Sequence, residues 1–176
     1  VCKGGIKTGL RRAENVYLKP AVSEKINHYL DTANKTFKSF FVGQFTEAII
    51  LGSLCTIGML ILKLPYAAMT GTVVGVTALI PIVGAYIGAA LGAFMILTQS
   101  PMQVLVFIIF LVILQQVEGN LIYPKVVGSS IGLPGIWVLA AVTVGGSLFG
   151  ITGMLLGVPT IATVYKLVYE DIANRE

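Results

Sequence analysis

Charged residues are missing from two long stretches of this chain. No formal charge lies among the 54 residues between Lys63 and Glu118, or among the 40 residues between Lys125 and Lys166. A membrane-spanning helix needs about 20 mainly apolar residues, so each stretch holds more than one span. Only 11% of the chain is charged, against about 25% in a typical soluble domain. The sequence therefore predicts an all-α, polytopic integral membrane protein.

The remaining charges gather before the first apolar stretch. Residues 1–38 hold eight Lys or Arg and three acidic residues, a net charge of +5. The pI of about 9.1 would also fit a nucleic-acid-binding protein. A basic block beside a membrane span more often lies at the cytoplasmic surface, against anionic headgroups. We therefore expect the lipid bilayer as a partner, no nucleic acid, and a cytoplasmic position for this block.

Residues 1–40 are predicted to form a basic linker and an amphipathic juxtamembrane helix. Apolar side chains recur there at helical spacing, at Val22, Ile26, Tyr29, Ala33, Phe37 and Phe40. This stripe fits either a helix packed on its own protein or a helix lying on the bilayer surface. The chain begins with Val, and we expect it to be part of a longer protein with further spans upstream.

Residues 41–170 are expected to form the transmembrane domain, and residues 171–176 a polar tail. After a first span over about 41–62, residues 64–98 would make a helix about 52 Å long, against about 30 Å of hydrocarbon. Pro81 and Gly84 near its middle predict a break, giving a re-entrant hairpin or two broken helices. A helix from Pro101 to about residue 123 then precedes an irregular segment over 124–134. Two last apolar runs are predicted to be hinged near Gly150 and Gly153.

Glu118 is the strongest single candidate for a functional side chain. It lies late in a hydrophobic helix, with Gln115 three positions earlier on the same face. A charge at the bilayer centre costs about 2.5–3.5 kcal/mol, so such groups usually face a cavity or a partner. Glu118 could line a solute or ion path, serve as a hydrogen-bond hub for the irregular segment, or reach the interface. Lys125 is a candidate partner if the helix breaks at Pro124, since a continuous helix would separate the two by about 10 Å.

Other polar residues have structural interpretations. Glu47 is expected near the start of the first span, as an interfacial carboxylate rather than a coupling group, and His28 at the surface. Cys2 and Cys55 lack metal-ligand spacing. No paired acidic site, Ser-His-Asp set or P-loop appears in the sequence. We therefore expect no enzyme activity, no cofactor and no metal.

Glycines at fixed spacing predict close helix packing. Gly84, Gly88 and Gly92 follow at i, i+4 and i+8, which places them on one face of a helix. A ridge of such small residues lets two membrane helices approach closely.

Three ordered motifs follow one another along the chain. The first is Pro81-Ile-Val-Gly84-Ala-Tyr-Ile-Gly88. The second is Gln115-Gln116-Val-Glu118-Gly119-Asn120, followed by Pro124-Lys125-Val-Val-Gly128. The third is Gly145-Gly146-Ser-Leu-Phe149-Gly150-Ile-Thr-Gly153-Met-Leu-Leu-Gly157-Val-Pro159. Together they resemble the autoinducer-2 exporter family of bacterial permeases, although Pro134-Gly135 stands where many members have His-Pro.

The resemblance implies a homo-oligomeric, multi-pass permease of the bacterial inner membrane. Members have been linked to export of autoinducer-2 and to sodium/proton antiport, so the partner is a small solute or a monovalent cation. We expect secondary transport by alternating access, in the export direction. The alternatives are a sodium/proton antiporter and a non-transporting scaffold in which the glycine ridge only drives assembly. Candidate path residues are Glu118, Gln115, Gln116, Asn120, Pro81, Gly84, Pro124 and Lys125. Candidate packing residues are Gly84, Gly88, Gly92, Gly145, Gly146, Gly150 and Gly153.

Overall fold

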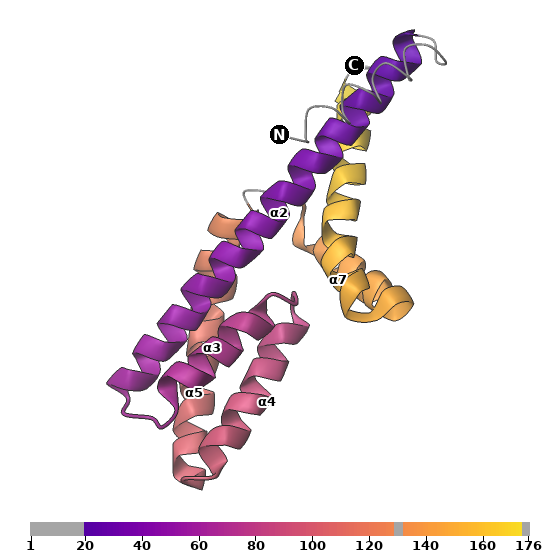
Figure 1. Cartoon of the computed structure of the whole chain (residues 1–176). Helices are drawn as coiled ribbons and strands as arrows, with labels where there is room; N and C mark the ends of the chain where they lie inside the picture. Colours follow the sequence, from indigo (N-terminus) through magenta and orange to yellow (C-terminus); the bar gives the residue numbers. More distant parts are fainter. Residues whose placement is uncertain (1–19, 129–131, 174–176) are drawn as a thin grey trace, which may run out of the picture.

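The computed structural model describes residues 20–128 and 132–173, and all regular structure within these ranges is helical. The elements are α2 (Pro20–Ile61), α3 (Ala67–Ala78), α4 (Val83–Leu97), α5 (Pro101–Val117), the π-helical segments η1 (Glu118–Ile122) and η2 (Pro124–Gly128), and α7 (Gly135–Ala173) (Figure 1). Three described stretches are long and apolar enough to cross a membrane, namely Ser23–Ile61, Pro101–Gly128 and Gly135–Ala173. The predicted all-α membrane fold is confirmed. The predicted linker over 1–19, Cys2 and the end of the polar tail lie outside the described residues.

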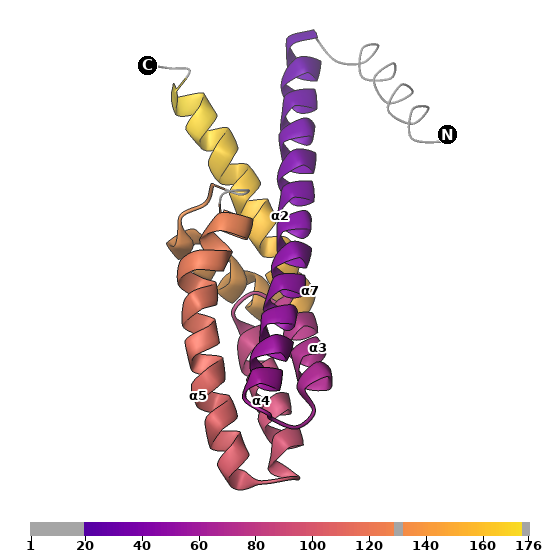
Figure 2. The same ribbon diagram turned by 90° about the vertical axis from the view of Figure 1, so that its left-hand side faces the viewer.

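Helix α2 joins the predicted amphipathic helix and the first span into one helix of 42 residues. At about 1.5 Å per residue it is about 63 Å long, roughly twice the hydrocarbon thickness of a bilayer. Lys38 is its last charged residue before Glu47, so we place the bilayer boundary near Lys38. The N-terminal half of α2 extends past α3, α4 and α5 and runs alongside the C-terminal end of α7 (Figure 2). A helix on this course cannot also lie along the bilayer surface.

The N-terminal half of α2 packs on the C-terminal half of α7. Thr36 and Phe40 are buried on the packed side, whereas Tyr29 is exposed, so the predicted apolar stripe is only partly right. Two polar contacts join the helices there. Lys166 Nζ donates to Thr36 Oγ1 at 3.5 Å, and His28 Nε2 lies 2.8 Å from Glu170 Oε2. His28 is at the surface, as predicted.

Helices α3 and α4 form a hairpin that turns at residues 79–82, where Pro81 predicted a break. Val83 N–H donates to the Pro81 carbonyl at 2.7 Å, which closes a γ-turn around Ile82. Ile82 has φ 66° and ψ −57°. A β-branched residue in this region is strained by about 1–3 kcal/mol and persists only where its surroundings enforce it. The hairpin tip is therefore held in place by the rest of the fold.

The glycine ridge of α4 is buried inside the chain. A Cβ at Gly84 would collide with the Thr77 carbonyl, and a Cβ at Gly88 would come within 3.1 Å of Val74 Cα. At Gly92 it would come within 2.7 Å of the Phe107 ring of α5. The ridge faces α3 and α5 of the same chain. The ridge is therefore not exposed for contact with another chain.

Helix α7 is a second hairpin, hinged where the sequence predicted. Phe149 and Gly150 leave helical geometry, with Gly150 at φ 59° and ψ −141°. The two arms meet through small residues. A Cβ at Gly145 would collide with the Gly153 carbonyl, and one at Gly157 would lie 2.8 Å from the Ala141 oxygen. Because of this hinge, the two arms of α7 fold back on each other, and their backbones come into direct contact.

We expect Gly150→Ala to destabilise the protein by about 1–3 kcal/mol, because the backbone at this position is essentially accessible only to glycine. No described atom lies within 4 Å of a Cβ placed there, so the effect isolates backbone strain from crowding. The melting temperature in lipid nanodiscs measures it. Gly119→Ala is the control, since that Cβ also meets nothing within 4 Å but the backbone is helical. Equal melting temperatures for the two variants would contradict the strained hinge.

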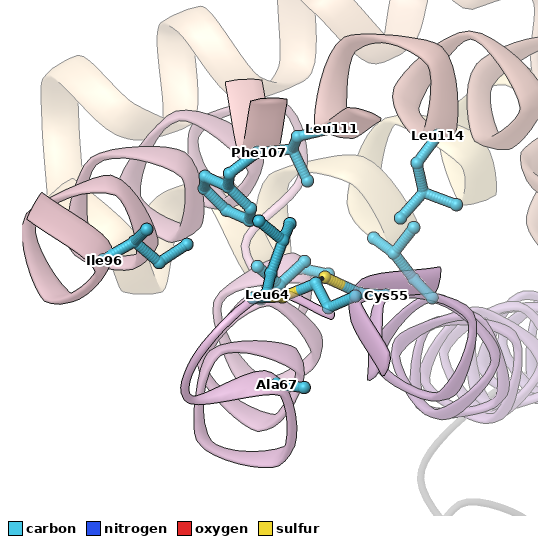
Figure 3. Close-up of a cluster of buried hydrophobic side chains, with 11 residues drawn as sticks. Cys55, Leu64, Ala67, Ile96, Phe107, Leu111 and Leu114 are labelled. Carbon is cyan, nitrogen blue, oxygen red and sulfur yellow. Dashed lines mark hydrogen bonds between the residues drawn. The ribbon is translucent and has the colours of Figure 1, made fainter. Parts of the chain in front are cut away.

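Two clusters of buried apolar side chains hold the bundle. The first joins α2, α3, α4 and α5 and includes Cys55, Ile96 and Phe107 (Figure 3). Cys55 is a fully buried core residue. The second joins α2, η2 and α7 around Phe40 and Val158. Many large apolar side chains on the outer surface remain exposed, as expected for helices solvated by lipid.

Candidate functional site: a polar cavity at the hairpin tip

A cavity of about 450 Å³ opens where the two apolar clusters meet. Its walls come from the middle of α2, the tip of the α3–α4 hairpin, the end of α5 with η1 and η2, and the start of α7. Most of the lining is apolar. Five polar side chains also line it: Gln44, Glu47, Gln115, Glu118 and Tyr123. The volume falls in the range of about 300–1,000 Å³ that is typical of small-molecule sites.

The two carboxyl groups of the cavity lie deep in the expected bilayer. Glu47 follows Lys38 by nine residues, which is about 13 Å along α2 and close to the middle of about 30 Å of hydrocarbon. Glu118 lines the same cavity as Glu47. Substrate sites of many secondary transporters lie near the bilayer midplane, formed by discontinuous helices. The position of this cavity matches that arrangement.

Glu47 is not the interfacial carboxylate that the sequence analysis expected. It lies in the middle of α2 and is 3% exposed. Gln44 Nε2 donates to Glu47 Oε2 at 3.0 Å and to the Ala78 carbonyl at 2.9 Å. Ala78 ends α3, where the last carbonyls have no helical partner. Gln44 therefore ties a cavity carboxyl group to the base of the hairpin tip.

Two amide atoms beside the cavity have no hydrogen-bond partner among the described residues. Gln44 Oε1 is one. The two groups that Gln44 Nε2 contacts are both hydrogen-bond acceptors, so the amide must direct its nitrogen toward them and its oxygen away from them. Gln115 Nε2 is the other. A buried polar atom left unpaired costs about 1–3 kcal/mol. Both residues line the cavity, and these two atoms are buried in its wall.

Around Glu118 the long helix widens instead of ending. The Tyr123 N–H donates to the Glu118 carbonyl five residues earlier, which is π-helical bonding. Pro124 has no N–H and its ring crowds the carbonyl four residues earlier, so a wider turn accommodates it. The prediction of a break at Pro124 is wrong, because π-helix continues to Gly128. Lys125 is exposed and does not line the cavity. Single π-turns often mark functional sites.

The structure brings together half of the predicted path residues. Glu118, Gln115, Pro81 and Pro124 line the cavity. The other four do not line it, namely Gln116, Asn120, Gly84 and Lys125. Asn120 Nδ2 donates to the Gln116 carbonyl at 2.8 Å on the outer surface, and Gly84 packs on α3.

Sequence reasoning missed Gln44 and Tyr123 as lining residues, and it misplaced Glu47. One signal could have found two of them. Gln44 and Glu47 repeat the Gln-x-x-Glu spacing of Gln115 and Glu118. Between residues 39 and 165 of the sequence, Glu47 is the only acidic residue besides Glu118. In the described part of the chain no group of three or more His, Cys, Asp or Glu side chains is arranged to hold a metal ion.

A multi-pass helical bundle with two carboxyl groups in a cavity between broken helices is an arrangement found in membrane transport proteins. A family profile described as AI-2E family transporter matches residues 10–172, and the chain belongs to this family. The resemblance drawn from the three motifs is thereby confirmed.

Curated relatives carry matching descriptions. The "Putative transport protein YueF" of Bacillus subtilis is 39% identical over 129 residues, covering 73% of this chain and 35% of that protein. The "Putative transport protein YrrI" of the same organism is 35% identical over 147 residues, covering 84% of this chain and 42% of that protein. The "Putative transport protein sll0063" of Synechocystis is 32% identical over 136 residues, covering 77% and 34%. The chain thus spans well under half the length of these relatives. No solved structure matches the chain.

Proposed function

We propose that this protein moves a small solute across the membrane by secondary transport, with the cavity between α2, the α3–α4 hairpin, α5 and α7 as its substrate site. The observation that supports the proposal is the convergence of Glu47 and Glu118 in one cavity, which the spacing from Lys38 to Glu47 places near the middle of the bilayer. Carboxyl groups at this depth are costly and are kept where they face a solute path. The proposal includes export as the direction, no enzyme activity, and a homo-oligomer in the bacterial inner membrane.

In this proposal the two hairpins alternate in exposing the cavity. The tip of the α3–α4 hairpin forms one wall through Pro81 and Ile82, and the start of α7 forms another through Val138 and Leu139. The γ-turn at Ile82 stores strain that a second arrangement of the tip would release. Gln44 holds the tip in the arrangement described, through the Ala78 carbonyl. Movement of the tip would therefore change the hydrogen bond between Gln44 and Glu47.

Glu118→Gln tests the role of the cavity. We expect solute flux in proteoliposomes of the full-length protein to fall by about tenfold or more, equivalent to about 1.4 kcal/mol, because the amide keeps the shape of the side chain and removes its charge. The melting temperature should be unchanged or raised, since a neutral group is less costly to bury. Glu170→Gln is the matched control, because Glu170 is a carboxylate at the surface end of α7. Wild-type flux through the Glu118 variant would remove this cavity from the mechanism.

Sodium/proton antiport is a second candidate, supported by one observation. It requires titratable groups in the path, and both acidic residues of the membrane region line the same cavity. A pH-jump fluorescence assay in sodium-loaded vesicles separates the candidates. Sodium-driven proton flux that is lost in the Glu118 variant would favour antiport over solute export.

A further inference from the structure

The cavity presents three hydrogen-bond acceptor groups close to one another. The carboxyl groups of Glu47 and Glu118 supply two, and the free amide oxygen of Gln44 supplies the third. Gln44 is 2% exposed, and its amide cannot turn its N–H groups to the cavity without losing both the Glu47 and Ala78 bonds. A ligand that binds to this wall must therefore donate hydrogen bonds to it. An ammonium group carries three donors and no acceptor.

The charge of the cavity points the same way. Among the described residues no Lys, Arg or His lines it, so two carboxyl groups share one cavity without a basic side chain. Charges interact more strongly in such an interior than in water, and an unpaired buried charge is strongly destabilising. A cationic solute would relieve this cost, an anion would add to it, and a neutral solute would leave it unchanged.

We propose that the cavity binds a small organic cation, a solute with a protonated primary amine that Glu47, Glu118 and the Gln44 amide oxygen hold together. This inference rests on the proposed function and names the class of its substrate. The Gln115 amide nitrogen, which has no hydrogen-bond partner among the described residues, donates to an acceptor on the same solute, such as a hydroxyl group. An amino alcohol is the simplest solute that carries both groups.

An organic cation fits this site better than a metal ion. The cavity of about 450 Å³ is far larger than a bare ion, and most of its lining is apolar. The described residues contain no group of three His, Cys, Asp or Glu side chains able to hold a metal. Calcium and magnesium ions take about six to eight oxygen ligands, more than two carboxyl groups and one amide oxygen supply. Apolar walls such as Leu51 and Val138 instead suit the carbon skeleton of an amine.

Equilibrium binding to the full-length protein in lipid nanodiscs tests the inference. The probes are ethanolamine, which is cationic at neutral pH, ethylene glycol as its neutral counterpart and glycolate as its anionic one. We expect ethanolamine to raise the melting temperature saturably, and to bind about tenfold or more tightly than ethylene glycol, a difference of about 1.4 kcal/mol. Glu47→Gln should weaken ethanolamine binding by a similar factor. Glu170→Gln, which changes a residue at the surface end of α7, should leave ethanolamine binding unchanged.

The outcomes separate this inference from the proposed function. Ethylene glycol or glycolate binding as tightly as ethanolamine, or no binding by any probe, would overturn it. Sodium chloride that displaces ethanolamine with equal affinity and the same dependence on Glu47 would assign the site to an inorganic cation and also overturn it. Flux of a neutral solute that depends on Glu118, without amine binding, would leave transport intact and reject the amine. Amine binding without flux of any solute would reject transport and keep the site.

Discussion

Gly84→Ala is expected to lower the stability of this protein by about 3 kcal/mol, at the upper end for an inserted methyl group. The Cβ would collide with the carbonyl of Thr77 and lie 3.0 Å from the backbone nitrogen of Ala78. A flexible side chain could move aside, but these atoms belong to the last turn of α3 and cannot. The α3–α4 hairpin would have to open at its tip. Since the tip forms a wall of the cavity, solute flux should fall together with stability.

The melting temperature in nanodiscs checks this expectation, with Gly119→Ala as the matched control. Both glycines lie in helical segments beside the cavity, and both substitutions add the same methyl group. The Cβ at Gly119 meets no described atom within 4 Å. A Gly84 variant as stable as the Gly119 variant would show that the hairpin arms do not touch at this point.

Gln44→Leu is expected to destabilise the protein by about 2–6 kcal/mol, because it leaves two buried groups without their hydrogen-bond donor, at about 1–3 kcal/mol each. One is the Ala78 carbonyl at the end of α3, and the other is the Glu47 carboxyl group. Leucine is close in size, so packing is largely kept. We expect reduced melting temperature and strongly reduced flux, since the hairpin tip loses its link to the substrate site.

Two comparisons isolate the hydrogen bonds from other effects of this substitution. Gln116→Leu makes the same change at an exposed position outside the cavity and should cost little. The double variant Gln44→Leu with Glu47→Leu removes the stranded carboxyl group as well. It should be less destabilised than the sum of the two single variants, because the residues share one interaction. Strict additivity would contradict a link between Gln44 and Glu47.

Local rules of the chain correctly predicted two of its helix breaks and misjudged a third. Pro81 cannot donate a helical hydrogen bond, and the hairpin turns there. Gly150 adopts a backbone conformation that other residues avoid, and α7 folds back there. Pro124 also lacks an N–H donor, but the helix does not end there, because π-helical hydrogen bonding accommodates the missing donor. Whether a proline ends a helix or widens it depends on the packing around it, which a single sequence does not show.

The membrane environment and the helical class followed from the sequence by itself, because long uncharged stretches can be solvated only by lipid and satisfy their backbone only as helices. Glu118 also stood out in this way, as an isolated charge in an apolar helix. Only the tertiary structure decided that Glu47 joins it. The two residues lie 71 positions apart, and their meeting depends on how α2 passes α5 and the hairpin tip. Helix crossing is set by interlocking side chains across many contacts, so the partner of a buried charge is a property of the packed bundle.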